Sequence, residues 1–154
     1  MLQIGGNSNR ESTKMNLPKA LWMDLDGTAS IITGRSPYQE ELCEQDKVNV
    51  PVIITMNLFR EAGYKIIICS GRDEGRGRAP TERWLAKHEI HYDELFLRPS
   101  GDLRKDAIIK KEIYLNQIKP KYDIFVCLDD RDQIVKMLRD ELGLTVFQVN
   151  WGNF

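Results

Sequence analysis

Five short apolar segments alternate with amphipathic segments along this chain. Each has the length of a strand, and together they are rich in Ile, Val and Phe; such near-continuous apolarity is typical of strands covered on both faces of a parallel sheet. The segments are Ala20–Leu25, Lys65–Cys69, Glu94–Leu97, Ile124–Leu128 and Thr145–Val149. The alternation predicts an α/β fold: a single doubly wound, Rossmann-like domain with a five-stranded parallel sheet and helices on both faces.

Four helices are predicted between and after these strands. They cover Val50–Ala62, Pro80–His88, Lys105–Gln117 and Asp132–Leu142. Asn49 is a candidate cap for the first helix and Gly63 a candidate stop. The interval Gly27–Lys47 is long enough for a flap, but no interval leaves room for a large cap domain. We therefore expect an open site, which suits the end of a polymer.

Length and composition describe one ordinary globular domain. Of 154 residues, 42% are hydrophobic and 29% are charged, and the formal net charge is −1. A nucleic-acid partner would therefore have to meet a local basic face. We assign residues 1–16 to a disordered polar tail and residues 17–154 to the folded domain. No apolar run approaches the roughly 20 residues that span a bilayer, so no membrane association is expected.

The cysteines favour a reducing compartment. Cys43, Cys69 and Cys127 form no CxxC pair, which makes a zinc site or a disulfide framework unexpected. Cys69 and Cys127 lie within apolar runs and are expected to be buried thiols. We expect a cytoplasmic location.

The sequence Asp24-Leu25-Asp26-Gly27-Thr28 begins at the end of the first predicted strand. Ligands of parallel α/β sheets bind at the carboxyl ends of strands, and Gly27 allows a turn that brings Asp26 back towards Asp24. Two carboxylates near one metal ion can divide the work, since one can attack phosphorus while the other transfers protons. A turn that only ends the strand is the alternative, because Asp and Gly are common turn residues.

Two later segments carry groups that suit a phosphate. Ser70-Gly71-Arg72 follows the second strand, where a hydroxyl, backbone N–H groups and a guanidinium can hold phosphate oxygens. Asp106 and Lys110 share one face of the third helix, so Asp106 can orient Lys110 towards an anion. The alternatives are a surface turn and a solvated ion pair.

Adjacent acids, Asp129 and Asp130, end the fourth strand. Two such charges after an apolar run are costly unless a positive charge compensates. Magnesium is a suitable compensating ion because it prefers a few oxygen ligands. A helix cap is the alternative, although Asp132 alone could supply it.

Together these four motifs resemble the haloacid dehalogenase superfamily of phosphotransferases, over roughly residues 19–154. They are the two aspartates of the first motif, the serine after the second strand, the lysine of the third helix and the adjacent acids after the fourth strand. A narrower resemblance, to the 3′-phosphatase domain of bacteriophage polynucleotide kinase–phosphatase, adds three segments: Thr33–Tyr38, Gly101–Asp106 and the ending Gly152-Asn153-Phe154. It implies a polynucleotide 3′-phosphatase that acts on 3′-phosphate ends of DNA or RNA, or on 3′-nucleotides. No GxxxxGK[ST] loop is present, so no kinase activity is expected.

The resemblance also implies roles for single residues. Asp24 would be the nucleophile and Asp26 the proton donor and acceptor, while Thr28, Ser70 and Lys110 hold phosphate oxygens. Arg35, Arg72 and Asp106 would act near the phosphate or the substrate. The implied Mg²⁺ ligands are Asp24, Asp26 (through its carbonyl), Asp129 and Asp130, with Asp130 preferred over Asp129.

Two other functions stay open at this stage. One is a phosphatase of the same superfamily for a small nucleotide or sugar phosphate. The other is a non-catalytic accessory module for nucleic-acid repair. DNA or RNA preference, oligomeric state, a separate kinase or ligase as partner, and a bacterial or phage-infected host cell are not decided by the residues.

Overall fold

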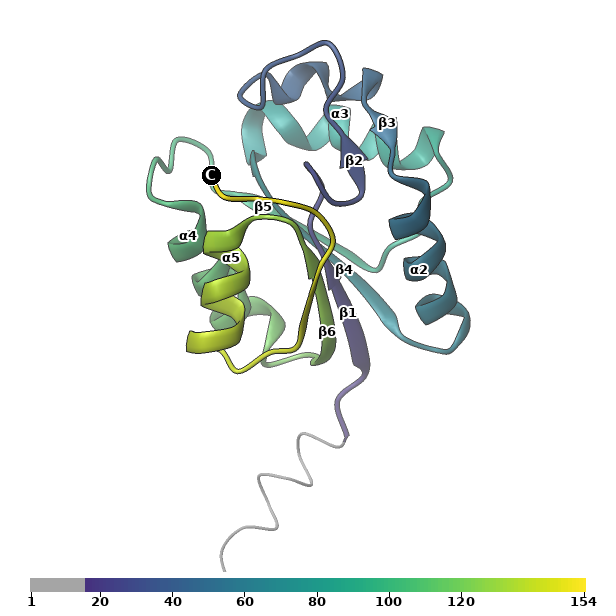
Figure 1. Ribbon diagram of the computed structural model, residues 1–154, viewed down its shortest axis with the longest axis vertical. Coiled ribbons are helices and arrows are strands. Elements are labelled where there is room, and N and C mark those ends of the chain that lie inside the picture. The colour runs from purple at the N-terminus through teal and green to yellow at the C-terminus, as the bar shows by residue number, and fades with distance from the viewer. Residues whose placement is uncertain (1–15) are drawn as a thin grey trace, which may run out of the picture.

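The computed structural model describes residues 16–154, which form a central sheet covered by helices (Figure 1). The strands are β1 (Lys19–Met23), β2 (Ser30–Ile31), β3 (Lys47–Val48), β4 (Lys65–Asp73), β5 (Glu94–Arg98), β6 (Asp123–Asp129) and β7 (Val146–Gln148). The helices are η1 (Glu40–Gln45), α2 (Val50–Glu61), α3 (Glu74–Lys87), α4 (Asp106–Ile113), η2 (Tyr114–Ile118), α5 (Asp132–Lys136) and η3 (Met137–Glu141). The π-helical turns η2 and η3 continue α4 and α5.

The main sheet has the order β5-β4-β1-β6-β7, and all its strands are parallel. The predicted α/β class and five-stranded sheet are thus confirmed. Successive connections run outward on one side of β1 as far as β5, and then cross to β6 on the other side. Such a reversal of strand order is the place where ligands bind in open α/β sheets.

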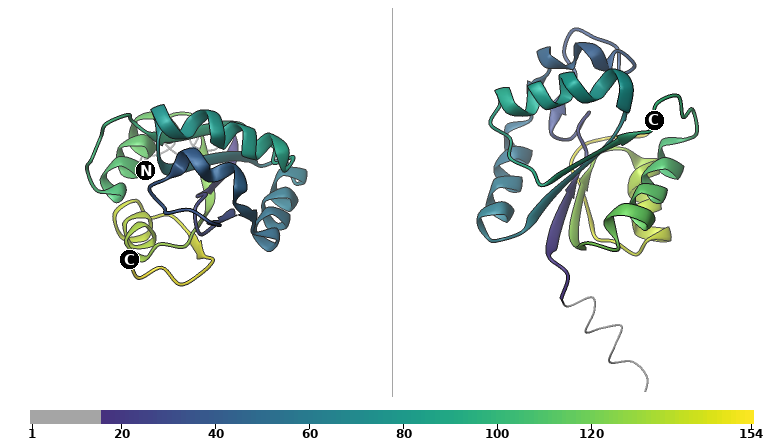
Figure 2. Two further views of the ribbon diagram at one scale, coloured as in Figure 1. Left: turned by 90° about the horizontal axis from the view of Figure 1, so that it is seen from above. Right: turned by 180° about the vertical axis from the view of Figure 1, so that it is seen from behind.

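Each face of the sheet has its own core, because neighbouring residues of β1 point to opposite faces. Ala20 and Trp22 face the cluster that α4 and α5 cover. Leu21 and Met23 face the cluster that α2 and α3 cover. The two pairs of helices are visible on either side of the sheet from behind (Figure 2). None of the helices within residues 16–154 is long and apolar enough to cross a membrane.

The flap after β1 folds back over the carboxyl ends of the strands. β2 and β3 pair antiparallel as a small ribbon, and η1 lies between them against α3. The sequence predicted a flap here but not the short helix η1. No large cap domain is present in residues 16–154, as expected.

One helix start was predicted wrongly. The sequence placed it at Pro80, whereas α3 begins at Glu74 and contains Pro80 in its interior. The side chain of Asp73 caps this earlier start by accepting hydrogen bonds from the N–H groups of Gly75 (2.8 Å) and Arg76 (3.1 Å). Packing on η1 thus outweighs the poor helix propensity of Gly75 and Gly77.

Two smaller expectations have different outcomes. Asn49 does precede α2, but its side chain makes no capping bond and instead donates to the carbonyl of Thr28 at 2.9 Å. Asn49 therefore ties the helix to the motif loop. The predicted disordered tail lies outside the described residues, apart from residue 16.

Candidate active site

Three carboxylates meet at the carboxyl ends of β1 and β6. The register makes them neighbours, since Met23 pairs with Leu128 and the next residues along are Asp24 and Asp129. The candidate ligand oxygens of Asp24, Asp129 and Asp130 lie within 4.8 Å of one another, and all three residues are buried. Burial raises the pKa of Asp24 well above its ordinary value, although Lys110 opposes the shift. Burial and the neighbouring Asp129 also raise the pKa of Asp130.

Lys110 provides the positive charge of this cluster. Its Nζ lies 2.9 Å from Oδ1 of Asp24 and 3.2 Å from Oδ2 of Asp129, and its side chain is only 2% exposed. Burial alone would lower the pKa of Lys110, but the surrounding carboxylates raise it well above its ordinary value. The side chain is therefore a permanent cation, suited to an anionic phosphate.

Asp130 packs so closely against Gly27 that a side chain at position 27 would collide with its carboxylate. A Cβ on Gly27 would lie 2.2 Å from Oδ2 of Asp130, and Gly27 has a positive φ of 79°. The hydroxyl of Thr28 donates to Oδ1 of Asp130 at 3.1 Å and lies 3.4 Å from Oδ2 of Asp24. Thr28 thus holds two acids of the cluster in place.

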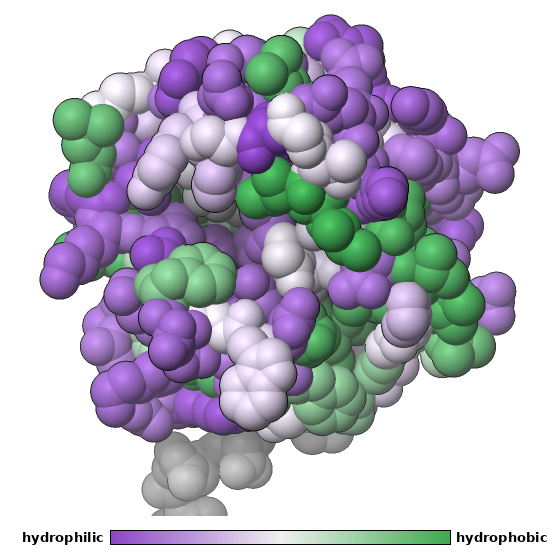
Figure 3. All heavy atoms as spheres, turned by 45° about the horizontal axis from the view of Figure 1, so that its top comes forward, coloured by the Kyte–Doolittle hydropathy of each residue, from purple (hydrophilic) through white to green (hydrophobic). Residues whose placement is uncertain are grey.

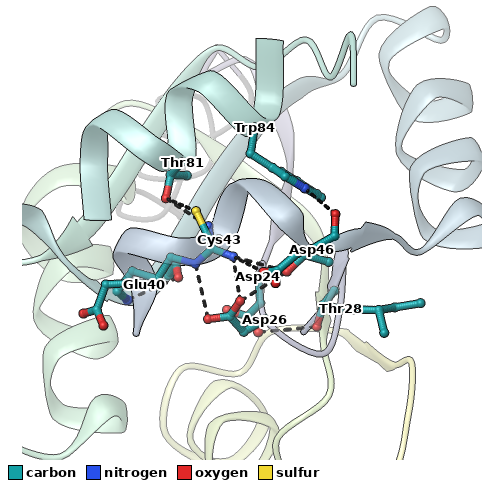
Figure 4. A network of polar contacts seen from close by, with 12 residues as sticks. Asp24, Asp26, Thr28, Glu40, Cys43, Asp46, Thr81 and Trp84 are labelled. Atoms are coloured by element: carbon teal, nitrogen blue, oxygen red, sulfur yellow. Dashed lines mark hydrogen bonds and ion pairs between the residues drawn. The ribbon is translucent and has the colours of Figure 1, made fainter. Parts of the chain in front are cut away.

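The carboxylate of Asp26 faces a different set of partners (Figure 4). Nη2 of Arg72 lies 2.6 Å from its Oδ1, and Nη2 of Arg35 lies 2.8 Å from the same atom. Burial alone would raise the pKa of Asp26, but Arg72 and Arg35 hold it below its ordinary value. Both guanidinium groups are buried, so they act on Asp26 rather than on open solvent.

A second buried carboxylate, Asp46, supports the two arginines from the end of η1. It pairs with Arg35 at 2.6 Å and lies 3.5 Å from Nη2 of Arg72. Its backbone carbonyl accepts from Nε1 of Trp84 at 2.9 Å, which fixes the flap to α3. Sequence analysis missed Asp46, and the only available signal was an acid at the end of a flap that also carried Arg35.

Ser70 and Asp106 complete the site beside the triad. Ser70 is buried at the point where β4 passes the triad, and its hydroxyl accepts from the N–H of Arg72 at 3.3 Å. Asp106 lies 4.0 Å from Nζ of Lys110 and pairs with Arg98 at 3.3 Å. A Cβ on Gly71 would lie 2.4 Å from Oδ1 of Asp106, so a glycine is needed there. Arg98 also donates to the carbonyl of Gly71 at 3.1 Å.

The end of β7 and the segment after it pack against the loop that carries Asp130. The carbonyl of Gly152 accepts from the N–H of Asp132 at 2.8 Å, and Gln148 donates to the carbonyl of Asp130 at 3.1 Å. A Cβ on Gly152 would lie 1.9 Å from that same carbonyl oxygen. This packing, which sequence analysis did not assign, fixes the loop that carries Asp130.

A pocket of about 770 Å³ opens over these groups. Its floor includes Asp24, Asp26, Ser70, Lys110 and both acids of the pair, whereas Thr28 and Arg35 do not line it. Figure 3 shows this face of the molecule, where hydrophobic groups stand among hydrophilic ones around a hollow. This volume lies within the usual range of pockets that bind drug-sized ligands, so the pocket is larger than a phosphate group needs.

The acidic triad fits a magnesium ion. Three carboxylates with their oxygens in one place match the oxygen ligands and the high charge that Mg²⁺ prefers. Burial raises the pKa values of Asp24 and Asp130, the neighbouring acids add to the shift, and a bound divalent cation would favour the charged form of both carboxylates. The carboxylate of Asp26 is not part of this triad, since it turns towards the arginines.

The chain is similar to several known proteins. A protein of Autographa californica nuclear polyhedrosis virus, provisionally named a bifunctional polynucleotide kinase/RNA ligase, is 34% identical over 134 residues, which are 86% of this chain and 19% of that protein. A chain in the solved structure of a Pnkp1/Rnl/Hen1 complex superimposes with a TM-score of 0.88 at 50% identity and covers 90% of this chain. A second, from a Pnkp1/Rnl/Hen1 RNA repair complex, gives a TM-score of 0.87, also at 50% identity over 90% of this chain.

These relatives are longer than the present chain. It spans 48% and 44% of the two structural relatives and about a fifth of the viral one. The family described as the polynucleotide kinase PNKP phosphatase domain matches residues 18–154, which include every residue of the site described above. The chain therefore belongs to the polynucleotide kinase PNKP phosphatase domain family, within the haloacid dehalogenase superfamily of phosphatases.

Proposed function

We propose that this protein is a magnesium-dependent polynucleotide 3′-phosphatase that works through an aspartyl-phosphate on Asp24. The observation that carries the proposal is the contact of Asp24 with a permanent cation, Lys110, at 2.9 Å within a buried acidic triad. Such a carboxylate is held for attack on an anion rather than for stability alone, because buried ion pairs contribute little net stability. Family membership and the pocket over Asp24 support it.

In the first step, an oxygen of Asp24 attacks phosphorus and the bond from phosphorus to the 3′-oxygen breaks, with a proton from Asp26 going to the leaving oxygen. In the second step, water attacks phosphorus of the aspartyl-phosphate, Asp26 takes a proton from it, and inorganic phosphate leaves. Arg72 and Arg35 favour the carboxylate form of Asp26, which is the form that the second step needs. Lys110 and the hydroxyl of Ser70 hold the charged phosphate oxygens.

Magnesium, when bound, would neutralise charge between the carboxylate and the phosphate. Asp24 and Asp130 would hold it, together with the carbonyl of Asp26. Asp129 is engaged with Lys110, whereas no lysine or arginine within residues 16–154 forms an ion pair with Asp130. This difference supports Asp130 as the direct ligand.

The relatives support a place in nucleic-acid repair beside separate partner activities. Two of them occur in complexes whose names include Rnl and Hen1, one described as an RNA repair complex. For this protein we therefore propose a nucleic-acid strand with a 3′-phosphate as the substrate and a separate kinase or ligase as a partner. We also propose the cytoplasm as its location. All three cysteines are buried free thiols, which suits that compartment.

The decisive assay is phosphate release from a 3′-phosphorylated oligonucleotide with and without Mg²⁺. A 5′-phosphorylated oligonucleotide of the same sequence and a 3′-mononucleotide serve as comparisons. Magnesium-dependent release from the 3′ substrates alone is expected. Release only from unrelated small phosphoesters would reject the polynucleotide substrate, and tight strand binding without any release would reject catalysis.

A further inference from the structure

The pocket is larger than its phosphate site, and its outer part has a different chemistry. The floor is charged, whereas four of the flap side chains that line the pocket are apolar or aromatic. These side chains are Ile31, Ile32, Pro37 and Tyr38, and we refer to them as the flap wall. A phosphate uses none of these groups, so the flap wall suits a part of the substrate that is apolar on at least one face.

Tyr38 is the aromatic member of the flap wall. The residue is 82% exposed, and no ring stacks on it within residues 16–154. Large aromatic side chains bury considerable apolar area when they find a partner. A tyrosine that stands free at the mouth of a phosphate pocket is therefore available to a ligand rather than used by the fold.

The backbone around Tyr38 is held in a defined turn. The N–H of Gln39 donates to the carbonyl of Ser36 at 3.0 Å, and the N–H of Ser36 donates to the side chain of Gln39 at 2.9 Å. The N–H of Tyr38 itself lies 3.2 Å from the hydroxyl of Ser36. The adjacent Arg35 fixes the base of this turn to Asp46 inside the protein. The backbone that carries the ring is thus ordered in advance, which lowers the entropy lost on binding.

We infer that the flap wall, through Tyr38, is the subsite for the base of the 3′-terminal nucleotide. The inference rests on the proposed function and gives a role to a part of the pocket that the proposed chemistry does not use. A nucleobase is the part of a nucleotide that is flat and apolar on its faces, and it stacks on aromatic rings without regard to sequence. The ring of Tyr38 would stack on the base while the phosphate reaches the charged floor.

The test compares two 3′-phosphorylated oligonucleotides that differ only in the last nucleotide, which is either intact or abasic. For the unmodified protein we expect kcat/KM to be about 5- to 150-fold higher on the intact strand, since stacking is worth ~1–3 kcal/mol per base. Tyr38→Ala should reduce this ratio to less than about twofold, through a loss of kcat/KM on the intact strand. Tyr38→Phe should retain the full ratio because it keeps the ring.

Leu58→Ala is the matched control, because Leu58 is 61% exposed on α2 and does not line the pocket. It should behave as the unmodified protein does on both strands. If Tyr38→Ala keeps the full preference for the intact strand, the inference is wrong while the phosphatase proposal stands. If the unmodified protein releases phosphate from neither strand, the proposed function fails and the base subsite fails with it.

Discussion

The guanidinium of Arg35 forms a forked ion pair with the carboxylate of Asp46, in which Nε lies 2.9 Å from Oδ1 and Nη2 lies 2.6 Å from Oδ2. Both side chains are fully buried. The same Nη2 reaches Asp26, so the flap and the second acid of the motif are joined by one side chain. Because only arginine has this planar fork, the position should tolerate no other cation.

Arg35→Lys should therefore lower kcat/KM at least about tenfold, since an ammonium group cannot make both contacts at once. The readout is phosphate release from a 3′-phosphorylated oligonucleotide, beside a thermal unfolding curve. Arg60→Lys, at an exposed position of α2, should change neither measurement. Full activity in Arg35→Lys would show that the fork does not matter for Asp26.

Asp24→Asn should abolish phosphate release, by at least about a thousandfold, because the amide cannot act as the nucleophile. The fold should persist, since the variant also removes one negative charge from a crowded triad. Phosphate release and circular dichroism test the two halves of this statement. Asp140→Asn, which changes an exposed acid paired with Lys136, should keep full activity. Residual turnover near that of the unmodified protein would exclude the covalent route.

Stability should depend on pH and magnesium together. Burial raises the pKa of Asp24 above its ordinary value of 3.8, and that of Asp130 is also raised. The stability that these groups contribute is complete below that value and is lost as pH rises through the raised pKa values. Without Mg²⁺ the free energy of unfolding should therefore fall as pH rises above about 4.

Magnesium should reverse this loss, because it binds the deprotonated acids. At 100 times the Kd it should add about 2.7 kcal/mol, which corresponds to a rise in Tm of roughly 5–10 °C. The measurement is thermal unfolding with Mg²⁺ or with a chelator at pH 5 and pH 8. A gain that is equal at both pH values, or that survives in Asp130→Asn, would place the ion elsewhere.

Gly152→Ala should weaken magnesium binding. The new Cβ would collide with the backbone carbonyl of Asp130, which cannot move aside as a side chain can. We expect Mg²⁺ affinity, measured by calorimetry on the protein without substrate, to fall at least about tenfold, in line with losses at other supporting contacts of metal sites. Gly143→Ala is the control, since Gly143 also has a special backbone (φ 66°) but open space around it. It should cost about 1 kcal/mol of stability and leave Mg²⁺ affinity unchanged.

The fold was predictable where a segment follows one strong local rule. The apolar runs of β1 and β6 and the helical spacing of α2 are of this kind, and so is the placement of Asp24 at a strand end. The start of α3 was not, because Asp73 caps it through its side chain and η1 packs against it. Local propensity at Gly75 and Gly77 says nothing of such tertiary contacts.

The residues of the site were predictable from the sequence only where they belong to a motif. Asp24, Lys110 and Asp130 belong to a spaced motif, whereas Asp46, Arg98 and Gly152 have roles that depend on what the fold brings beside them. Asp46 lies 20 positions after Asp26 in the chain, yet one arginine bridges the two acids. Only the three-dimensional path of the flap reveals that pairing.

The pairing of Met23 with both Ile68 and Leu128 has a consequence for insertions and deletions. One residue gained or lost inside β1 or β6 would move Asp24 away from Asp129 and turn the following side chains to the opposite face. A length change in the turn at Gly63 or in the loop at Gly101, which have open space around them, leaves the strand ends where they are. Changes of chain length in this protein should therefore be confined to its loops, while the central strands keep a fixed count.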